Sequence, residues 1–274
     1  MTDVVTSTAT SADGTRIAYR SEGIGPGLVV LSGVLRAAQH YRRLAQELAS
    51  HFTVHLVDRR GRGDSGTGQG SYAIEREQED LIAVLDRTGS TATFGHSFGG
   101  LVALRVARTY PLTKLAVYEP AVSVGGSLPT AWLPAFERAL ANDNPVAAFR
   151  IVASGLGSLG VASRLPGWLL DAVFMRMAHG AEWELTASLL PTLVREAKAA
   201  KSLDSSVETY REVQAECLLM YGTASPLFFR RGVGELASVI PHAHMLAQPG
   251  LHHNAPDEQD PAAVAGALRE FLLA

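Results

Sequence analysis

The sequence Thr91-Ala-Thr-Phe-Gly-His-Ser-Phe-Gly-Gly100 is followed directly by the apolar run Leu101-Val-Ala-Leu-Arg-Val-Ala-Arg108. The β-branched and aromatic residues of the first run, and the apolar second run, predict a strand, a sharp turn and a buried helix. Ser97 falls at the turn, in a Gly-x-Ser-x-Gly pattern that is typical of a nucleophile elbow. In such a turn the helix directs free N–H groups and its positive dipole end at the serine. The alternative is a glycine-rich turn with a solvated serine.

The rest of the chain alternates apolar runs with helical patterns. Residues 27–33 and 53–57 are nearly continuous apolar runs, as expected of strands that are buried on both faces. A turn at Asp13-Gly14 joins two short segments, which predicts an antiparallel hairpin at one edge. Further predicted strands are 114–118, 216–221 and 243–247, and predicted helices are 41–50, 74–87, 101–108 and 261–273. This alternation predicts an α/β fold, with a mostly parallel twisted sheet and helices on both faces.

Residues 121–212 interrupt the alternation with apolar, helical patterns. Four helices are predicted there, at 131–141, 146–156, 166–178 and 181–200. The sequence therefore predicts a core domain of residues 1–120 and 213–274, with 121–212 as a helical cap insertion over Ser97. The alternative is a set of scaffold helices that do not contact substrate.

A serine hydroxyl becomes a good nucleophile when a base takes its proton and a third group orients that base. In elbow enzymes the chain order is serine, acid, histidine, so the base is expected after the last strand, at His252 or His253. The usual acid position lies in Gly222-Thr-Ala-Ser-Pro226, which contains Ser225 and no carboxylate. Glu119, at the end of the strand 114–118, is the preferred acid.

Asp257 is a weaker candidate for the acid, and Asp58 is expected to hold its own loop together. An oxyanion hole requires two backbone N–H groups aimed at the developing negative oxygen. The N–H of Phe98, directly after the serine, is one expected donor. The other is expected from the loop after the strand 27–31, and position favours Val34.

The chain resembles the α/β-hydrolase superfamily, in particular small bacterial serine esterase-like members with a helical cap. The resemblance rests on five stretches: Ser32-Gly33, Asp58-Arg-Arg-Gly-Arg-Gly-Asp-Ser65, Gly95-His-Ser-Phe-Gly-Gly100, Tyr118-Glu-Pro120 and Pro249-Gly-Leu-His-His253. It implies an α/β-hydrolase fold and, from a common Gly-x-x-His run, His253 as the base. Ser32 stands where most members have histidine, and Ser225 where most have aspartate. Some members place the acid where Glu119 stands.

Composition and charge exclude several other classes of protein. Apolar residues make up 47% and charged residues 19% of the 274 residues, an ordinary globular balance. The net charge of −3 gives no indication of nucleic-acid binding, and the short Arg59-Arg-Gly-Arg62 run is expected to be solvated or structural. A single cysteine, Cys217, precludes a disulfide framework within the chain and fits a cytoplasmic protein. We expect no signal peptide and no membrane span.

The sequence contains no convincing cofactor motif. The run Gly61-x-Gly-x-x-Gly66 leads into polar residues instead of a helix, so it is interpreted as a turn and not as a dinucleotide site. No metal-ligand spacing is present beyond His252-His253. We therefore expect a small-molecule substrate and neither a metal nor an organic cofactor.

The residues and the resemblance together predict a serine hydrolase acting on an ester, thioester or lactone of a small, largely apolar substrate. Ser97 at the elbow, in place of aspartate, argues against dehalogenase or epoxide-hydrolase chemistry. Two alternatives stay open. One is an enzyme that reuses the triad for C–C bond cleavage, cyclisation or cofactor-free oxygenation. The other is a small-molecule binding protein whose triad is weakened by Ser225.

Overall fold

The computed structural model describes residues 4–204 and 206–274. Within these residues, one eight-stranded sheet has the order β1-β2-β4-β3-β5-β6-β7-β8. The strands are β1 Val5–Thr10, β2 Arg16–Gly23, β3 Gly27–Leu31, β4 Thr53–Val57, β5 Ala92–His96, β6 Lys114–Tyr118, β7 Glu216–Gly222 and β8 Ala243–Gln248. β2 pairs antiparallel with β1 and β4, and all other neighbouring strands are parallel. The predicted mostly parallel sheet with an edge hairpin is confirmed.

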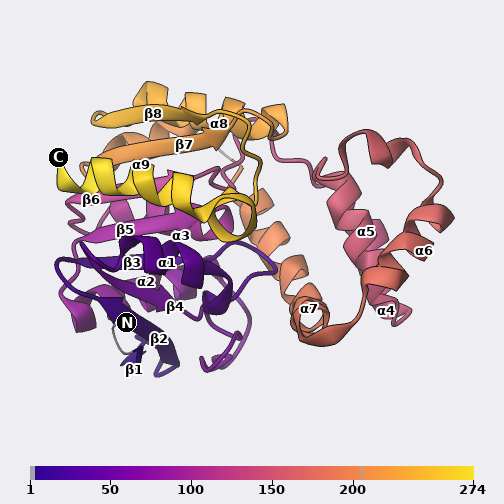
Figure 1. The fold of residues 1–274 in the computed structure, drawn as a ribbon, viewed down its shortest axis with the longest axis horizontal. Coiled ribbons are helices and arrows are strands. Elements are labelled where there is room, and N and C mark those ends of the chain that lie inside the picture. The colour runs from indigo at the N-terminus through magenta and orange to yellow at the C-terminus, as the bar shows by residue number, and fades with distance from the viewer. Residues whose placement is uncertain (1–3, 205) are drawn as a thin grey trace.

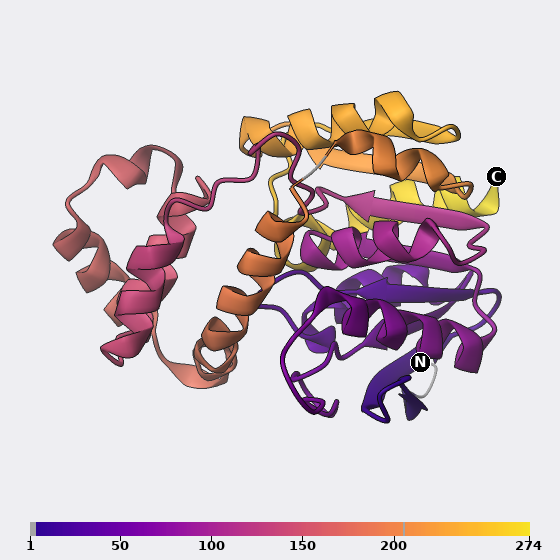
Figure 2. The same ribbon diagram turned by 180° about the vertical axis from the view of Figure 1, so that it is seen from behind.

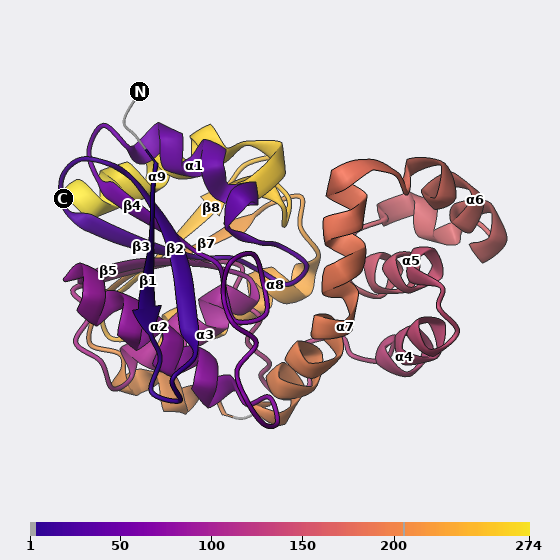
Figure 3. The same cartoon turned by 90° about the horizontal axis from the view of Figure 1, so that it is seen from below.

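Helices cover both faces of this sheet, as Figure 3 shows. They are α1 Arg42–Leu48, α2 Ile74–Thr88, α3 Phe98–Ala107, α8 Leu227–Val239 and α9 Pro261–Leu273. α1 and α9 pack on one face, and α2, α3 and α8 pack on the other. Successive residues of a strand point to opposite faces of the sheet, so Val29 packs in the core on one face and Val30 in the core on the other. This two-sided burial explains why the central strands are continuous apolar runs.

A helical insertion between β6 and β7 forms a separate body beside the sheet (Figures 1 and 2). It contains α4 Leu133–Ala141, α5 Pro145–Gly155, α6 Gly167–Met177 and α7 Gly180–Ser202. Trp132, Phe136, Val152 and Leu193 form its apolar core, which also includes Leu35 from the sheet domain. In both views α7 runs between the sheet and the other insertion helices. The insertion therefore packs against the sheet domain mainly through α7.

The predicted elements differ from the observed ones mainly at their ends and at one helix. The helix predicted at 41–50 is a 3₁₀ turn, Ala38–Tyr41, followed by the shorter α1. α8 was not predicted from the sequence, because Gly232 and Gly234 weaken the helical pattern there. No helix in the described part of the chain is long and apolar enough to cross a membrane.

Candidate active site

Ser97 occupies a strained turn between β5 and α3. Its backbone has φ 53° and ψ −117°, a conformation that costs a non-glycine residue about 1–3 kcal/mol. Its N–H donates to the Tyr118 carbonyl over 3.0 Å, and its carbonyl accepts from the Ala121 N–H over 2.9 Å. A Cβ on Gly99 would lie 2.5 Å from the Leu31 carbonyl oxygen. The second glycine of the motif is thus required because the helix start packs directly against β3.

Glu119 and His253 follow β6 and β8, the two strands on either side of β7, and their side chains meet beyond the ends of these strands. Glu119 directly follows β6, is fully buried and has φ 45°. Its Oε1 accepts from the Gly222 N–H over 2.7 Å, and its Oε2 lies 2.7 Å from Nδ1 of His253. The pairing of β6 with β7 explains the first contact, because it places residue 119 beside the end of β7. A carboxylate accepts only, so Nδ1 carries the proton and Nε2 is free to take one.

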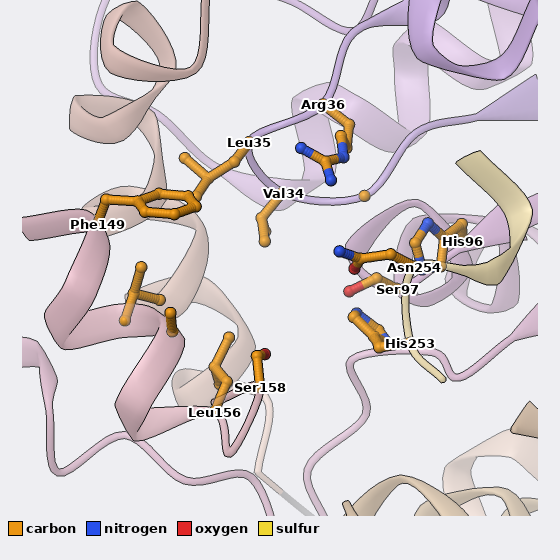
Figure 4. A pocket seen from close by; sticks show the side chains of 13 residues that line it. Val34, Leu35, Arg36, His96, Ser97, Phe149, Leu156, Ser158, His253 and Asn254 are labelled. Carbon is orange, nitrogen blue, oxygen red and sulfur yellow. The ribbon is translucent and has the colours of Figure 1, made fainter. Parts of the chain in front are cut away.

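Two aromatic rings also contact His253. Phe229 of α8 stacks on the imidazole, with ring centroids 4.1 Å apart and planes 12° apart. The ring of His96, which precedes Ser97, is tilted by 52° to the imidazole, with ring centroids 4.7 Å apart. These contacts fix the orientation of the ring plane. Figure 4 shows the His253 ring beside Ser97, whose hydroxyl faces the same cavity.

The other candidates from the sequence have different partners. His252 is exposed, and its Nδ1 accepts from the Asn254 N–H. Asp257 forms an ion pair with Arg36, and no hydrogen bond joins it to His253 among the described residues. Ser225 has a buried Oγ without a hydrogen-bond partner in the described part of the chain. His252 is therefore not placed as His253 is, and neither Asp257 nor Ser225 is placed as Glu119 is.

Asp58 holds its own loop together, as predicted. Its Oδ1 accepts from the Ala38 N–H over 3.2 Å and its Oδ2 from the Asp64 N–H over 3.3 Å. The side chain is almost completely buried. It thus links the loop after β4 with the start of the 3₁₀ turn.

The two expected oxyanion donors border the same space as Ser97. Phe98 is the first residue of α3, so its N–H has no partner within the helix. The carbonyl of Gly33 accepts from Nη1 of Arg62 over 2.9 Å. The C=O and N–H of a trans peptide unit point in opposite directions, so the N–H of Val34 points away from Arg62. Val34 and Ser97 both line the cavity.

Tyr41 links His96 to the loop that follows β3. The Tyr41 hydroxyl accepts from the Gly33 N–H over 3.1 Å and lies 2.6 Å from Nδ1 of His96. Burial, and then repulsion from His253, hold the pKa of His96 well below its usual value of 6.5. A neutral imidazole that carries its proton on Nε2 accepts a hydrogen bond from the tyrosine hydroxyl at Nδ1.

Two pockets meet at Ser97, and both have walls from the helical insertion. The first is lined by polar and apolar side chains, among them Arg36, Phe149, Val152, Ser158 and Asn254 (Figure 4). The second is mostly apolar and includes Leu128, Trp132, Leu193, Ala197 and Phe229. Val34, Ser97, Leu156 and His253 line both. No group of three or more His, Cys, Asp or Glu side chains within residues 4–204 and 206–274 is arranged to hold a metal ion.

Sequence reasoning missed the buried charges beneath the loop that follows β3. Arg59 and Arg62, expected only to be solvated or structural, are almost completely buried and contact Glu196 of α7. One signal was available for Glu196. It shares a helix face with Leu189, Leu193 and Ala200, so a charged residue falls at an apolar position.

Comparison with known proteins identifies the family. The model of a family described as "Alpha/beta hydrolase family" matches residues 28–267, and this chain belongs to that family. A pimeloyl-[acyl-carrier protein] methyl ester esterase of Sodalis glossinidius is 30% identical over 263 residues, which cover 92% of this chain and 96% of the esterase. An alpha/beta hydrolase structure from Sphaerobacter thermophilus is 32% identical with a TM-score of 0.79, and the match covers 97% of this chain and 100% of that one.

A third relative has a different activity. A 2-heptyl-3-hydroxy-4-quinolone dioxygenase of Rhodococcus erythropolis is 36% identical over 101 residues, which cover 35% of this chain and 37% of the dioxygenase. The chain is thus similar to an esterase over nearly its full length and to a dioxygenase over about a third of it.

Proposed function

We propose that this protein is a serine hydrolase that cleaves an ester, thioester or lactone through an acyl-enzyme on Ser97. The observation that carries the proposal is the 2.7 Å contact between Glu119 and His253 in a cavity that Ser97 also lines. A buried carboxylate on Nδ1 makes Nε2 the basic atom, and that atom is the one a serine hydroxyl requires. The full-length similarity to an esterase supports the same reaction class.

In the proposed reaction, Nε2 of His253 takes the Ser97 proton as Oγ attacks the substrate carbonyl. Glu119 stabilises the resulting imidazolium, and the N–H groups of Phe98 and Val34 hold the negative oxygen of the tetrahedral intermediate. The intermediate collapses, and His253 gives its proton to the leaving oxygen or sulfur. Water then attacks the acyl-enzyme by the same route and releases the acid, which leaves Ser97 protonated.

The two pockets suggest where the acyl group and the leaving group of a substrate bind. An apolar acyl group fits the second pocket, because apolar side chains dominate its wall and desolvation there is favourable. The leaving group fits the first pocket, where Ser158 and Asn254 can solvate a polar product. In this proposal residues 1–120 and 213–274 form the core domain, and 121–212 form a cap that shapes both pockets.

Product analysis tests the proposed reaction. The wild-type protein is incubated with p-nitrophenyl butyrate, and both products are quantified, with Ser97→Ala and His253→Ala as controls. We expect equal amounts of acid and alcohol from the wild type and at least a hundredfold slower release from each variant. Equal rates for the wild type and Ser97→Ala would overturn the proposal.

The dioxygenase match favours a second candidate, in which the same pocket supports oxygenation without a cofactor. Oxygen consumption with a hydroxyquinolone, measured in the absence of added metal or flavin, separates this candidate from hydrolysis. The alternative of a binding protein without catalysis has less support. It was considered because Ser225, after β7, replaces the usual acid, but Glu119 at the end of the adjacent strand β6 contacts His253 instead.

A further inference from the structure

Four charged side chains are buried together beneath the loop that follows β3. We call Arg59, Arg62, Glu77 and Glu196 the arginine–glutamate cluster. Arg59 donates from Nε and Nη2 to the two oxygens of Glu77, over 2.6 and 2.7 Å. Oε1 of Glu196 accepts from Nη2 of Arg59 over 2.7 Å and from Nη2 of Arg62 over 2.5 Å. Two positive and two negative charges are therefore balanced among side chains that are almost completely buried, and Glu196 also lines the second pocket.

The Nη1 groups of the two arginines hold the loop itself. Nη1 of Arg62 donates to the Gly33 carbonyl over 2.9 Å and to the Arg36 carbonyl over 3.0 Å. Nη1 of Arg59 lies 3.3 Å from the Ser32 and Gly33 carbonyls. Because the Gly33 carbonyl is held on this side, the N–H of Val34 in the same peptide unit is directed to the other side.

Arg59 also contacts the side chain of Phe98, whose backbone N–H is the other expected oxyanion donor. Its guanidinium carbon lies 4.7 Å from the centroid of the Phe98 ring. Arg59 therefore contacts the peptide unit of one expected donor and the side chain of the residue that carries the other, while Arg62 contacts only the first of these, through the Gly33 carbonyl. Neither arginine lines the two pockets at Ser97.

The fourth member of the cluster comes from a different part of the molecule. Glu77 lies on α2 beneath the sheet, but Glu196 lies on α7 of the helical insertion, 137 positions from Arg59. Without Glu196, the two buried guanidiniums would be left with Glu77, which accepts hydrogen bonds from Arg59, while the carboxylate that bridges Arg59 and Arg62 would be gone. Burial and repulsion from Arg59 already lower the pKa of Arg62, and Glu196 opposes that shift.

Docking of the insertion alone does not account for such a residue. Buried ion pairs often contribute no more stability than apolar side chains of similar size. This cluster also leaves Oε2 of Glu196 and Nε of Arg62 buried without a partner in the described part of the chain. Leu193 and Ala197 on the same face already provide apolar contacts. The charge is therefore better explained by what it does to the arginines.

We propose that Glu196 is a positioning residue that couples docking of the helical insertion to the formation of the oxyanion hole. Glu196 holds Arg59 and Arg62 under the Gly33 carbonyl, and the arginines direct the Val34 N–H toward the reacting carbonyl oxygen. The inference rests on the proposed hydrolase function. It adds that the insertion controls transition-state stabilisation as well as the shape of the pockets.

The test compares Glu196→Gln with Glu182→Gln, a matched control on the same helix. Glu182 also joins the insertion to the core, through His40 at 2.9 Å, but it is exposed and does not contact the arginines. For each protein, kcat and KM for p-nitrophenyl butyrate are measured per site titrated with a fluorophosphonate, so that unfolded protein is not counted. The inhibition constant of a boronic acid, whose tetrahedral adduct places an oxygen in the oxyanion hole, is measured alongside.

We expect Glu196→Gln to lower kcat 10- to 100-fold, to leave KM within threefold and to weaken boronate inhibition by a similar factor. Glu182→Gln should stay within threefold of the wild type in all three. The inference is overturned if Glu196→Gln keeps kcat within threefold, or if kcat falls while boronate inhibition is unchanged. If Glu196→Gln does not fold, Arg62→Lys is judged by the same criteria. A wild type that is not labelled at Ser97 would instead refute the proposed function.

Discussion

Oε2 of Glu119 lies 2.7 Å from Nδ1 of His253, although 134 positions separate the two residues in the chain. Each residue has a second contact that holds it: Glu119 accepts from the N–H of Gly222 at the end of β7, and His253 is stacked on Phe229 of α8. In the proposed mechanism the pair thus provides a base whose tautomer and ring plane are set before substrate arrives. Preorganisation of this kind is what a serine nucleophile requires.

Replacing Glu119 by glutamine should remove the charge and reverse the preferred tautomer of His253. By analogy with aspartate-to-asparagine changes in serine proteases, we expect kcat to fall by about 10²- to 10⁴-fold. Asp257→Asn is the control, because Asp257 is a buried carboxylate near the site that pairs with Arg36 instead. Asp257→Asn should lower kcat by less than about tenfold. Steady-state turnover of a p-nitrophenyl ester measures both, and a larger loss in Asp257→Asn would contradict the assignment.

His96 should make the protein less stable in acid. Its pKa in the folded state lies well below 6.5, so the unfolded chain binds a proton that the native state excludes. Its contribution to stability is therefore fully present above pH 6.5 and is lost as the pH falls below that value, by up to about 1.4 kcal/mol per pH unit. Urea unfolding of the wild type and His96→Gln at pH 5, 6, 7 and 8 measures this. The prediction fails if both proteins show the same slope below pH 6.5.

Gly99 should tolerate no side chain, because its Cβ would lie 2.5 Å from one backbone carbonyl oxygen and 2.7 Å from another. We expect Gly99→Ala to reduce the free energy of unfolding by about 1–3 kcal/mol or more. Gly234→Ala in α8 is the control, since nothing lies within 4 Å of its added Cβ. That change should stabilise the protein by about 0.5–1 kcal/mol. Chemical denaturation compares the two, and equal effects would refute the packing argument.

The division of substrate between the pockets can be tested by filling each one. Ala197→Leu narrows the second pocket, and Ala153→Leu narrows the first. We expect Ala197→Leu to lower the ratio of kcat/KM for octanoate over acetate p-nitrophenyl esters by about 10-fold or more. Ala153→Leu should change that ratio by less than about threefold. Because a ratio does not depend on the fraction of folded protein, a larger effect of Ala153→Leu would place the acyl group in the first pocket.

Local sequence patterns predicted much of the fold, because the features that specify it are themselves local. The elbow at Ser97 depends on glycines and a following helix, both of which are local features. Glu119 could be singled out because residues 222–226 contain no carboxylate and because adjacent parallel strands end at the same edge of the sheet. The buried core followed from continuous apolar runs.

The arginine–glutamate cluster could not be predicted in the same way. Arg59 and Glu196 are brought together by the packing of α7 on the sheet domain, and no local pattern specifies that contact. The direction of the Val34 N–H depends in turn on those arginines, so position alone could only suggest it. α8 was missed because two glycines within it oppose the helical pattern, while burial of Val233 and Leu236 stabilises it.

The central claim is that His253 and Glu119 activate Ser97 as a nucleophile. It is tested most directly by the rate of covalent labelling with a fluorophosphonate, followed by intact mass and peptide mapping. The account predicts one adduct per chain, located on Ser97, with labelling at least a hundredfold slower in His253→Ala and absent in Ser97→Ala. A wild-type protein that is folded but not labelled, or an adduct that persists in Ser97→Ala, would contradict it.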